Sequence, residues 1–303
     1  MVYLSPQSSQ MNVGPRLLLF PLLQMRLLLL LCLVALAVAT PPASDNGAHP
    51  YVGIAYRYVD SLNGYVVCSG SLVNIPALAN TGSYVFLTAG QCIAYGSGNG
   101  EQFQVTFSQS PGFTRDSNTG QIVEVVTDVS YSGVGYSEYR LDHFQDDAGK
   151  NFGFITLNLP SAVATALGSA PAFPAQVGAF STAFPFPKAD YSPLLTVGYG
   201  FSDDATHILG DRRDCGIQVA VGISDIIAAT LSPQCYLGQS GAPLLADGII
   251  YGVSLLSTVN PKPPLKSKAQ YERTDSSDFQ DLMARVIPMI NPSATAGGGA
   301  SGN

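Results

Sequence analysis

The stretch Cys235-Tyr236-Leu237-Gly238-Gln239-Ser240-Gly241-Ala242-Pro243 places one serine in a glycine-containing turn, directly before an apolar run that begins at Leu244. Glycines on both sides of the serine permit backbone conformations that a Cβ would forbid, and they let another molecule approach the main chain. Such a turn exposes the hydroxyl of Ser240, and the N–H groups of Gly238 and Ser240 can converge to form an oxyanion hole. The alternative interpretation is an ordinary Gly/Ser turn without any chemistry.

The composition indicates one all-β domain with a substantial core. The chain has 303 residues, of which 46% are hydrophobic and only 12% are charged. Its 31 glycines and 21 prolines indicate many turns, as in a protein built from short strands. The net charge is −7 and no basic cluster is present, so we expect no nucleic-acid partner.

Residues 1–39 have the features of a secretory signal peptide. They contain two bases, Arg16 and Arg26, and no acid, and every residue from Leu27 to Ala39 is apolar. A membrane anchor is the rival interpretation, but this continuous run is shorter than the ~20 residues that a spanning helix needs. We therefore expect a secreted, extracellular chain that makes no membrane contact after signal removal, and whose true start is either Met1 or Met25.

Four cysteines remain after Cys32 leaves with the signal peptide. An even number of cysteines in an exported chain implies two disulfide bridges. Four cysteines allow three pairings, and their spacing alone does not choose among them. The four are Cys68, Cys92, Cys215 and Cys235.

Short runs of strand-forming residues are separated by turn residues along most of the chain, which is typical of a barrel or a sandwich. One helix is expected near the end, because Phe279, Leu282, Met283 and Val286 share one face of residues 276–287 and Pro288 follows. The expected strands are residues 51–59, 65–73, 84–92, 102–107, 121–126, 152–159, 194–200, 244–246 and 249–254.

Several motifs resemble those of trypsin- and chymotrypsin-like serine proteases, and they occur in the family's order. They are Cys68-Ser69-Gly70-Ser71-Leu72, Leu87-Thr88-Ala89-Gly90-Gln91-Cys92, Asn151-Phe152-Gly153-Phe154-Ile155-Thr156-Leu157 and the Ser240 loop. The resemblance implies an all-β fold of two six-stranded antiparallel β-barrels with a C-terminal helix. It also implies the disulfides Cys68–Cys92 and Cys215–Cys235.

The same resemblance implies a domain organisation. A signal peptide at 1–39 precedes a protease-homologue domain at 40–290, and residues 291–303, rich in Gly and Ala, form a flexible tail. Within the domain, barrel one is expected at about 48–160, barrel two at about 175–275 and the helix at 276–287.

Two of the family's three catalytic positions are changed. The family's serine is Ser240, with Gly238 and Ser240 as backbone oxyanion donors, but its histidine is Gln91 and its aspartate is Asn151. An amide cannot take the serine proton near neutral pH, and Asn151 has no charge with which to stabilise a protonated base. The sequence therefore predicts a pseudoprotease that acts by binding an extracellular protein, as a decoy, an inhibitor or a cofactor.

Other readings remain open at this point. Ser240 could work with a non-standard base such as His143, which lies near Asp146 and Asp147 in the loop before Asn151, and the protein would then be an active secreted hydrolase. A simple adhesion or storage role is a third reading. His49 and His207 are expected to be solvated. We expect no cofactor and no metal, because the three histidines are scattered and the cysteines are paired.

Overall fold

The computed structural model describes a set of ranges that includes most of the expected strands. All of the described ranges belong to the larger of two compact units, Pro41–Asn303. The expected signal peptide at 1–39 and tail at 291–303 lie outside the described residues. The described residues are 47–75, 78, 82–94, 99–139, 150–168, 170–171, 194–199, 210–223, 226–231, 240–260 and 266–290.

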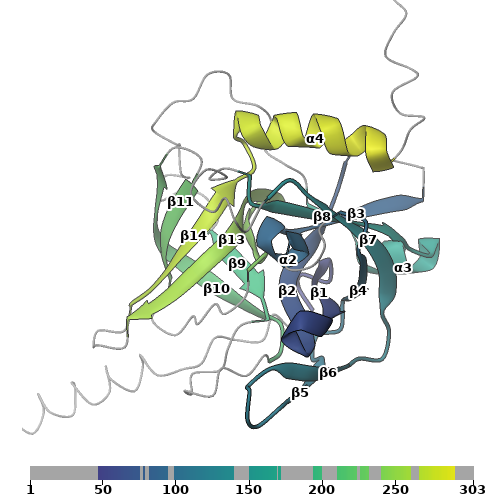
Figure 1. Ribbon diagram of the computed structural model, residues 1–303. Helices are drawn as coiled ribbons and strands as arrows, with labels where there is room; N and C mark the ends of the chain where they lie inside the picture. The colour runs from purple at the N-terminus through teal and green to yellow at the C-terminus, as the bar shows by residue number, and fades with distance from the viewer. Residues whose placement is uncertain are drawn as a thin grey trace, which may run out of the picture. The chain divides into compact units, whose positions relative to one another are not determined.

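The first half of the chain forms a six-stranded antiparallel barrel. Its strands follow the ring order β1-β4-β7-β8-β3-β2, and the ring closes because β1 also pairs with β2 (Figure 1). A hairpin of β5 (Gly112–Arg115) and β6 (Ile122–Val126) is attached to β2 through the pair Tyr65 and Ile122. The barrel strands are β1 (Val52–Val59), β2 (Gly64–Val73), β3 (Ser83–Ala89), β4 (Gln102–Thr106), β7 (Tyr131–Ser137) and β8 (Phe152–Asn158).

The second half forms a closed barrel in the order β10-β11-β14-β13-β12-β9. The expected two-residue turn at Asp247-Gly248 joins β12 to β13, and both residues have positive φ, as a tight hairpin turn requires. The prediction of two six-stranded barrels is thus confirmed. The strands are β9 (Leu195–Gly198), β10 (Arg213–Ile223), β11 (Ile226–Leu231), β12 (Pro243–Ala246), β13 (Ile249–Asn260) and β14 (Lys266–Arg273).

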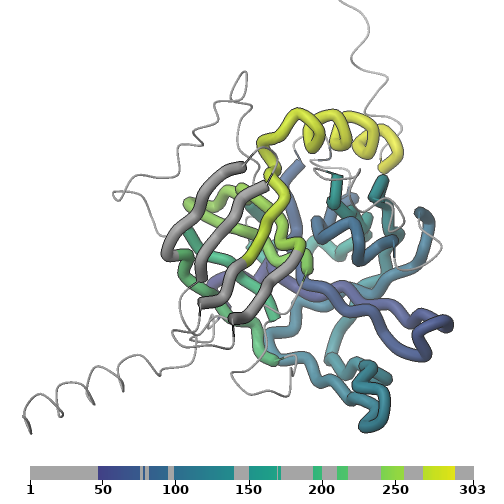
Figure 2. Tube along the Cα trace, turned by 60° about the vertical axis from the view of Figure 1, so that its left-hand side comes forward, coloured from purple at the N-terminus to yellow at the C-terminus, as the bar shows by residue number. Residues whose placement is uncertain are grey.

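The C-terminal helix α4 (Ser277–Ile290) follows the second barrel but packs against the first (Figures 1 and 2). The Ser276 hydroxyl caps it by accepting the N–H of Phe279 at 3.1 Å. The four expected apolar side chains are all buried. The expected end at residue 287 is wrong, because Pro288 lies inside the last turn, where its missing N–H removes only one helical hydrogen bond.

The third expected strand, 84–92, is shorter than predicted. It ends at Ala89, and the chain turns into a short helix α2 (Gly90–Ala94) that carries Gln91. The N–H of Gly90 donates to the carbonyl of Asn151 at 2.9 Å, so pairing with the chain before β8 redirects the backbone here. This turn is what points Gln91 away from the sheet.

Several elements were not expected from the sequence, above all β7. Its sequence has glycines at 133 and 135, which are poor strand formers, so it gives no strong strand signal. It forms because it is paired on both sides, with β4 and with β8. The other unexpected elements are β5, β10, β11, β14, the 3-10 turn at Asp60–Leu62 and α3 (Ser161–Ala166).

Buried polar contacts join the two barrels. The Tyr199 hydroxyl donates to the carbonyl of Val52 at 3.3 Å, and Arg212 donates to the same carbonyl at 2.9 Å. Tyr199 is fully buried and Arg212 almost so, so these bonds are shielded from water. The expected disulfide Cys68–Cys92 is confirmed and ties β2 to α2. Among the described residues no helix is long and apolar enough to span a membrane.

Candidate functional site

Ser240 lies where β12, β13 and the first barrel meet. Its carbonyl accepts the N–H of Ser69 on β2 at 3.0 Å, and the N–H of Gly241 donates to the carbonyl of Ser254 on β13 at 2.7 Å. Gly241 has φ +92°, and a Cβ there would lie 2.0 Å from the Ser69 carbonyl oxygen. Position 241 must therefore be glycine, because both the conformation and the lack of space exclude a side chain.

Gln91 reaches the serine hydroxyl from the opposite barrel. Its Nε2 donates a short hydrogen bond to Ser240 Oγ and a second one to the carbonyl of Leu255 at 3.0 Å. Ser240 Oγ donates to the same Leu255 carbonyl at 3.0 Å. Among the described residues, Ser240 Oγ thus has an amide N–H on its lone pair and a peptide carbonyl as the acceptor for its proton.

Asn151 holds Gln91 in this position from just before β8. Its Oδ1 accepts the main-chain N–H of Gln91 at 2.8 Å, and its Nδ2 donates to Gln91 Oε1 at 3.3 Å. Because Asn151 Oδ1 accepts the first bond, Asn151 Nδ2 must be the atom that faces the Gln91 amide. Gln91 therefore presents its Oε1 to Asn151 and its Nε2 to Ser240 and Leu255. Asn151 is only 4% exposed, so this arrangement is shielded from water.

The arrangement lacks the chemistry of an activated nucleophile. A serine hydroxyl attacks only when a base removes its proton in the transition state. Gln91 is a donor in this network, and a peptide carbonyl is far too weak a base to take the proton of Ser240. None of the three side chains changes charge near neutral pH, so the network gives the site no means of general acid–base catalysis.

The structure brings three of the predicted site residues together, Ser240, Gln91 and Asn151. Several other predicted site residues lie outside the described residues, so the oxyanion pair and the alternative base stay predictions. Cys215 is disulfide-bonded, and the other half of its bridge lies outside the described part of the chain. The residues outside are Gly238, Cys235, Gln239, His143 and His207.

Sequence reasoning missed two features of the site. The carbonyl of Leu255 is a partner of both Ser240 and Gln91, and a backbone group leaves no signature in the residue type. The other is the support beneath the serine, where Thr88 Oγ1 donates to the Ser69 carbonyl at 2.7 Å and Ser69 donates in turn to Ser240. Thr88 and Ser69 do lie in the motifs that carry the family resemblance, so position in a motif was the available signal.

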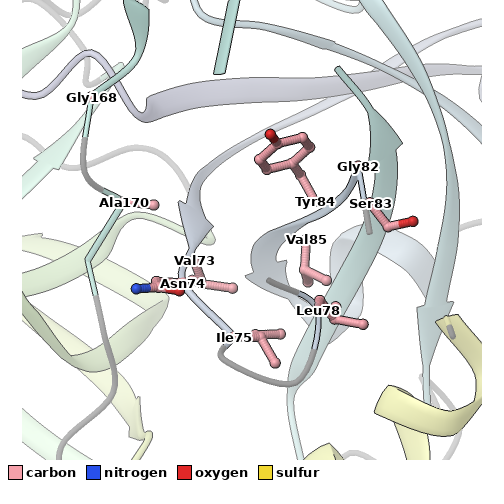
Figure 3. A pocket seen from close by; sticks show the side chains of 10 residues that line it. All are labelled: Val73, Asn74, Ile75, Leu78, Gly82, Ser83, Tyr84, Val85, Gly168 and Ala170. Atoms are coloured by element: carbon pink, nitrogen blue, oxygen red, sulfur yellow. The ribbon is translucent and has the colours of Figure 1, made fainter. Parts of the chain in front are cut away.

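A pocket lies at the β2–β3 end of the first barrel (Figure 3), and Ser240 is not among its lining residues. Its volume is about 280 Å³, and aliphatic side chains form most of its wall. Its lining includes an amide and hydroxyl groups, among them the phenol of Tyr84, and neither a carboxylate nor a histidine is among the lining residues. The lining residues are Val73, Asn74, Ile75, Leu78, Gly82, Ser83, Tyr84, Val85, Gly168 and Ala170.

Within the described ranges, no cluster of three or more His, Cys, Asp or Glu residues could hold a metal ion. The one described histidine, His49, lies beside Tyr51 with ring centroids 5.8 Å apart, and it is part of the segment that enters β1.

Comparisons with known proteins show the fold and nothing finer. No family model and no curated protein matches the sequence. Among solved structures, the inactivated protease paralogue S-D1 of the scabies mite has a TM-score of 0.52 at 14% identity, covering 82% of this chain and 97% of its own. The mite's inactivated protease paralogue S-I1 has a TM-score of 0.50 at 12% identity, covering 82% and 100%.

A third solved structure is the thermostable serine protease AL20 from an extremophilic microorganism, with a TM-score of 0.47 at 17% identity, covering 80% of this chain and 98% of its own. The two barrels, the C-terminal helix and the mite structures agree, and this chain has the trypsin-like serine protease fold.

Proposed function

We propose that this chain is a secreted serine protease homologue without protease activity, which acts by binding another extracellular protein. The observation that carries the proposal is the hydrogen bonding of Ser240. Its lone pair accepts an amide N–H of Gln91 and its proton points to the Leu255 carbonyl, where a protease needs a basic nitrogen.

The size of the chemical loss supports an inactive protein. Removal of the nucleophile or base of a Ser-His-Asp triad lowers turnover by about 10⁶-fold, which corresponds to ~8 kcal/mol of barrier. Backbone oxyanion donors do not replace the missing base, because a working triad uses the same donors in addition to its base. A serine held by Gln91 and Asn151 is therefore expected to be silent toward peptides, and the protein's role must then come from binding.

The fold neighbours and the disulfide favour the same reading. Both mite proteins carry the description of inactivated protease paralogues, so the fold exists in proteins that have lost activity. The bridge Cys68–Cys92 suits an oxidising compartment and agrees with the predicted signal peptide. The partner is a protein outside the cell, and decoy, inhibitor and cofactor roles all fit this chemistry.

The test combines serine labelling with turnover assays. The purified mature protein is treated with a fluorophosphonate probe and is assayed on casein, on a peptide library and on small esters. We expect no labelling of Ser240 and no cleavage above that of the Ser240→Ala variant. Cleavage that Ser240→Ala abolishes would contradict the proposal. Loss of that cleavage in a His143→Ala variant as well would establish the alternative, an active hydrolase that uses His143.

A further inference from the structure

Strand β5 has a neighbour on one side only. Each barrel closes on itself, so each barrel strand has two partners, and β6 lies between β2 and β5. Strand β5 pairs with β6 alone, and β6 in turn meets β2 at the single pair Tyr65 and Ile122, so the outer side of β5 is an open edge among the described residues. Figures 1 and 2 both show the β5–β6 hairpin projecting away from the barrels.

The open edge is accessible. Gly112 and Thr114 are exposed, and no hydrogen bond joins the outer side of residues 112–114 to another described residue. In an antiparallel strand with one neighbour, alternate residues point their backbone N–H and C=O groups away from that neighbour, where no partner strand accepts them. Natural proteins usually cover or pair such groups, so the outer edge of β5 is a template for one more strand.

The hairpin is held firmly at its base by both barrels. Thr106 and Thr127 share a hydrogen bond of 2.7 Å between their hydroxyls. From the second barrel, the N–H of Arg212 donates to the Gln109 carbonyl at 2.8 Å, and the Tyr199 hydroxyl donates to the Ser108 carbonyl at 2.5 Å. A rigid edge loses little conformational entropy when a partner binds.

The two faces of the hairpin differ in chemistry. Phe113 lies opposite Val125 on one face, and Thr114 lies opposite Glu124 on the other, where Thr114 Oγ1 donates to Glu124 at 2.9 Å. Three valines of β6 and of the segment after it are also exposed, and Val126 lies opposite Gly112. They are Val123 at 38% exposure, Val126 at 55% and Val129 at 53%.

The charge around β5 is mainly acidic. Between residues 112 and 129 there are three carboxylates and one base, and the base, Arg115, already donates to the Gly120 carbonyl within the hairpin. The whole chain has a net charge of −7. Both the local and the overall charge therefore attract a basic segment. The carboxylates are Asp116, Glu124 and Asp128.

We propose that β5 accepts an extended segment of a partner protein as an added strand, with apolar and basic residues in alternation. The apolar residues lie on the Phe113 face, and the basic residues lie on the face of Thr114 and Glu124. This strand edge would be the surface for the protein binding proposed above. The proposal holds whether or not Ser240 is catalytically active.

A second copy of this chain is a poor occupant of the same edge. Two copies would each bring a net charge of −7, which opposes their association. Pairing β5 with itself joins strands of only four residues, far from the roughly 1,200 Å² or more that stable interfaces bury. A peptide strand needs less area and supplies the opposite charge.

The test uses a probe peptide of alternating Lys and Val, acetylated and amidated. One matched peptide carries N-methyl groups on alternate residues, which removes N–H donors, and a second has Glu in place of Lys. Binding to the full mature protein is measured by fluorescence anisotropy and located by amide hydrogen exchange. We expect slowed exchange at residues 112–115, loss of binding on N-methylation, and at least about tenfold weaker binding of the Glu peptide.

Two variants test the charge argument. Glu124→Lys is expected to weaken binding of the Lys peptide by about tenfold, since it replaces the carboxylate on the Thr114 face with a positive charge. Asp281→Lys makes the same charge change on the exposed face of α4, and we expect it to leave binding unchanged. A circular dichroism spectrum and melting curve identify any variant that has lost its fold.

Several outcomes would overturn the proposal. They are equal binding of the N-methylated peptide, protection confined to segments around Ser240, no binding at millimolar peptide, or self-association of the free protein through β5 in sedimentation. Each leaves the serine-labelling result untouched, because that assay uses no peptide strand. Failure of this proposal and failure of the proposed function are therefore separate results.

Discussion

At the residue scale, the hypothesis of an inactive protease depends on which group accepts the hydroxyl proton of Ser240. In a working triad the serine proton lies on the path to a basic nitrogen. Here the Ser240 hydroxyl donates to Leu255, and Gln91 occupies the serine lone pair. Gln91 also donates to Leu255 at 3.0 Å, so among the described residues Ser240, Gln91 and the Leu255 carbonyl close a ring that contains no base.

The double change Gln91→His with Asn151→Asp is expected to restore labelling of Ser240 by a fluorophosphonate. An imidazole at position 91 can accept the hydroxyl proton, and a carboxylate at position 151 can hold its tautomer and stabilise its charge. The measurement is the rate of labelling, with mass spectrometry to locate the adduct. Ser240→Ala in the same background should abolish labelling. Gln91→His alone should label at least about tenfold more slowly than the pair, because an uncharged Asn151 orients the wrong tautomer.

Gly241→Ala is expected to destabilise the protein by roughly 3 kcal/mol or more. Its Cβ would approach the Ser69 carbonyl to 2.0 Å and Thr88 Oγ1 to 2.3 Å, on top of the strain of φ +92°. Gly248→Ala is the matched control, since its φ is +73° but nothing lies within 4 Å, and it should cost only about 1 kcal/mol. Urea unfolding of both variants gives the comparison, and equal losses would mean that the contact with Ser69 does not matter.

At the element scale, α4 joins the end of the second barrel to the wall of the first. Phe279 lies 4.6 Å from Phe152 and 6.3 Å from Phe154, measured between ring centroids, and both partners are on β8. Asn151, which directs Gln91, immediately precedes this strand. The helix therefore supports the strand whose start positions the candidate site.

Phe279→Ala is expected to lower the free energy of unfolding by about 4 kcal/mol, because it leaves a large cavity at the α4–β8 contact. Asp281→Ala, on the exposed side of the same helix, should change it by no more than about 0.5 kcal/mol. Chemical denaturation followed by circular dichroism provides both values. A small effect at Phe279 would show that the helix contributes little to the stability of the first barrel.

A second contact of α4 is charged and titrates in acid. Arg285 donates two hydrogen bonds to Glu138, at 2.8 and 2.6 Å, and the Tyr136 hydroxyl donates a third at 3.1 Å. The hydrogen bonds from Arg285 are the main reason that the pKa of Glu138 lies below its ordinary value of 4.5. The hydrogen bonds to Glu138, followed by the negative charge of Glu138, raise the pKa of Arg285, and burial raises the pKa of Tyr136.

Glu138→Gln is expected to lower Tm at neutral pH by no more than about 3 °C, since both partners are partly solvated. A carboxylate whose pKa is depressed in the folded state stabilises the fold above its unfolded pKa, and this contribution is lost as the pH falls through the folded pKa. Melting curves of the two proteins should therefore converge only as the pH falls below this depressed pKa of Glu138. A Tm difference that persists in acid would assign the effect to packing. Asp211→Asn, an exposed carboxylate without an ion pair among the described residues, should show no comparable difference.

At the scale of the whole molecule, the site exists only where the two barrels meet. Ser240 and its Leu255 partner belong to the second barrel, while Gln91, Asn151 and Ser69 belong to the first. A covalent bond reinforces the first side, because Cys68–Cys92 closes a loop within the first barrel. The predicted bridge Cys215–Cys235 would do the same beneath the serine turn.

Non-reducing peptide mapping is expected to find Cys68 joined to Cys92 and Cys215 joined to Cys235. The double variant Cys68→Ala with Cys92→Ala should lose ~3 kcal/mol of stability in the chain-entropy estimate for a separation of 24 residues. Unfolding in urea, with and without reductant, measures the loss. A peptide linking Cys215 to either first-barrel cysteine would contradict the pairing.

The sequence by itself determined the chemical inventory of this protein. The motifs around Cys68, Cys92 and Ser240, the apolar face of α4 and the turn at Asp247-Gly248 are local patterns, so they identify the fold and the replaced residues without coordinates. The residue type at a position determines its functional group whatever the conformation. Gln91 is therefore an amide in any fold, and an amide is not a base.

Only the tertiary structure decided what those groups contact. Gln91 and Ser240 are 149 positions apart, and Gln91 and Asn151 are 60 apart, so their hydrogen bonds depend on how the barrels pack. The Leu255 carbonyl is a backbone group that no residue type announces, and the open edge of β5 follows from its pairing with β6 alone. Which strands pair with each other depends on the whole sheet and not on one local segment. This is the physical reason why the sequence predicted neither β7 nor β5.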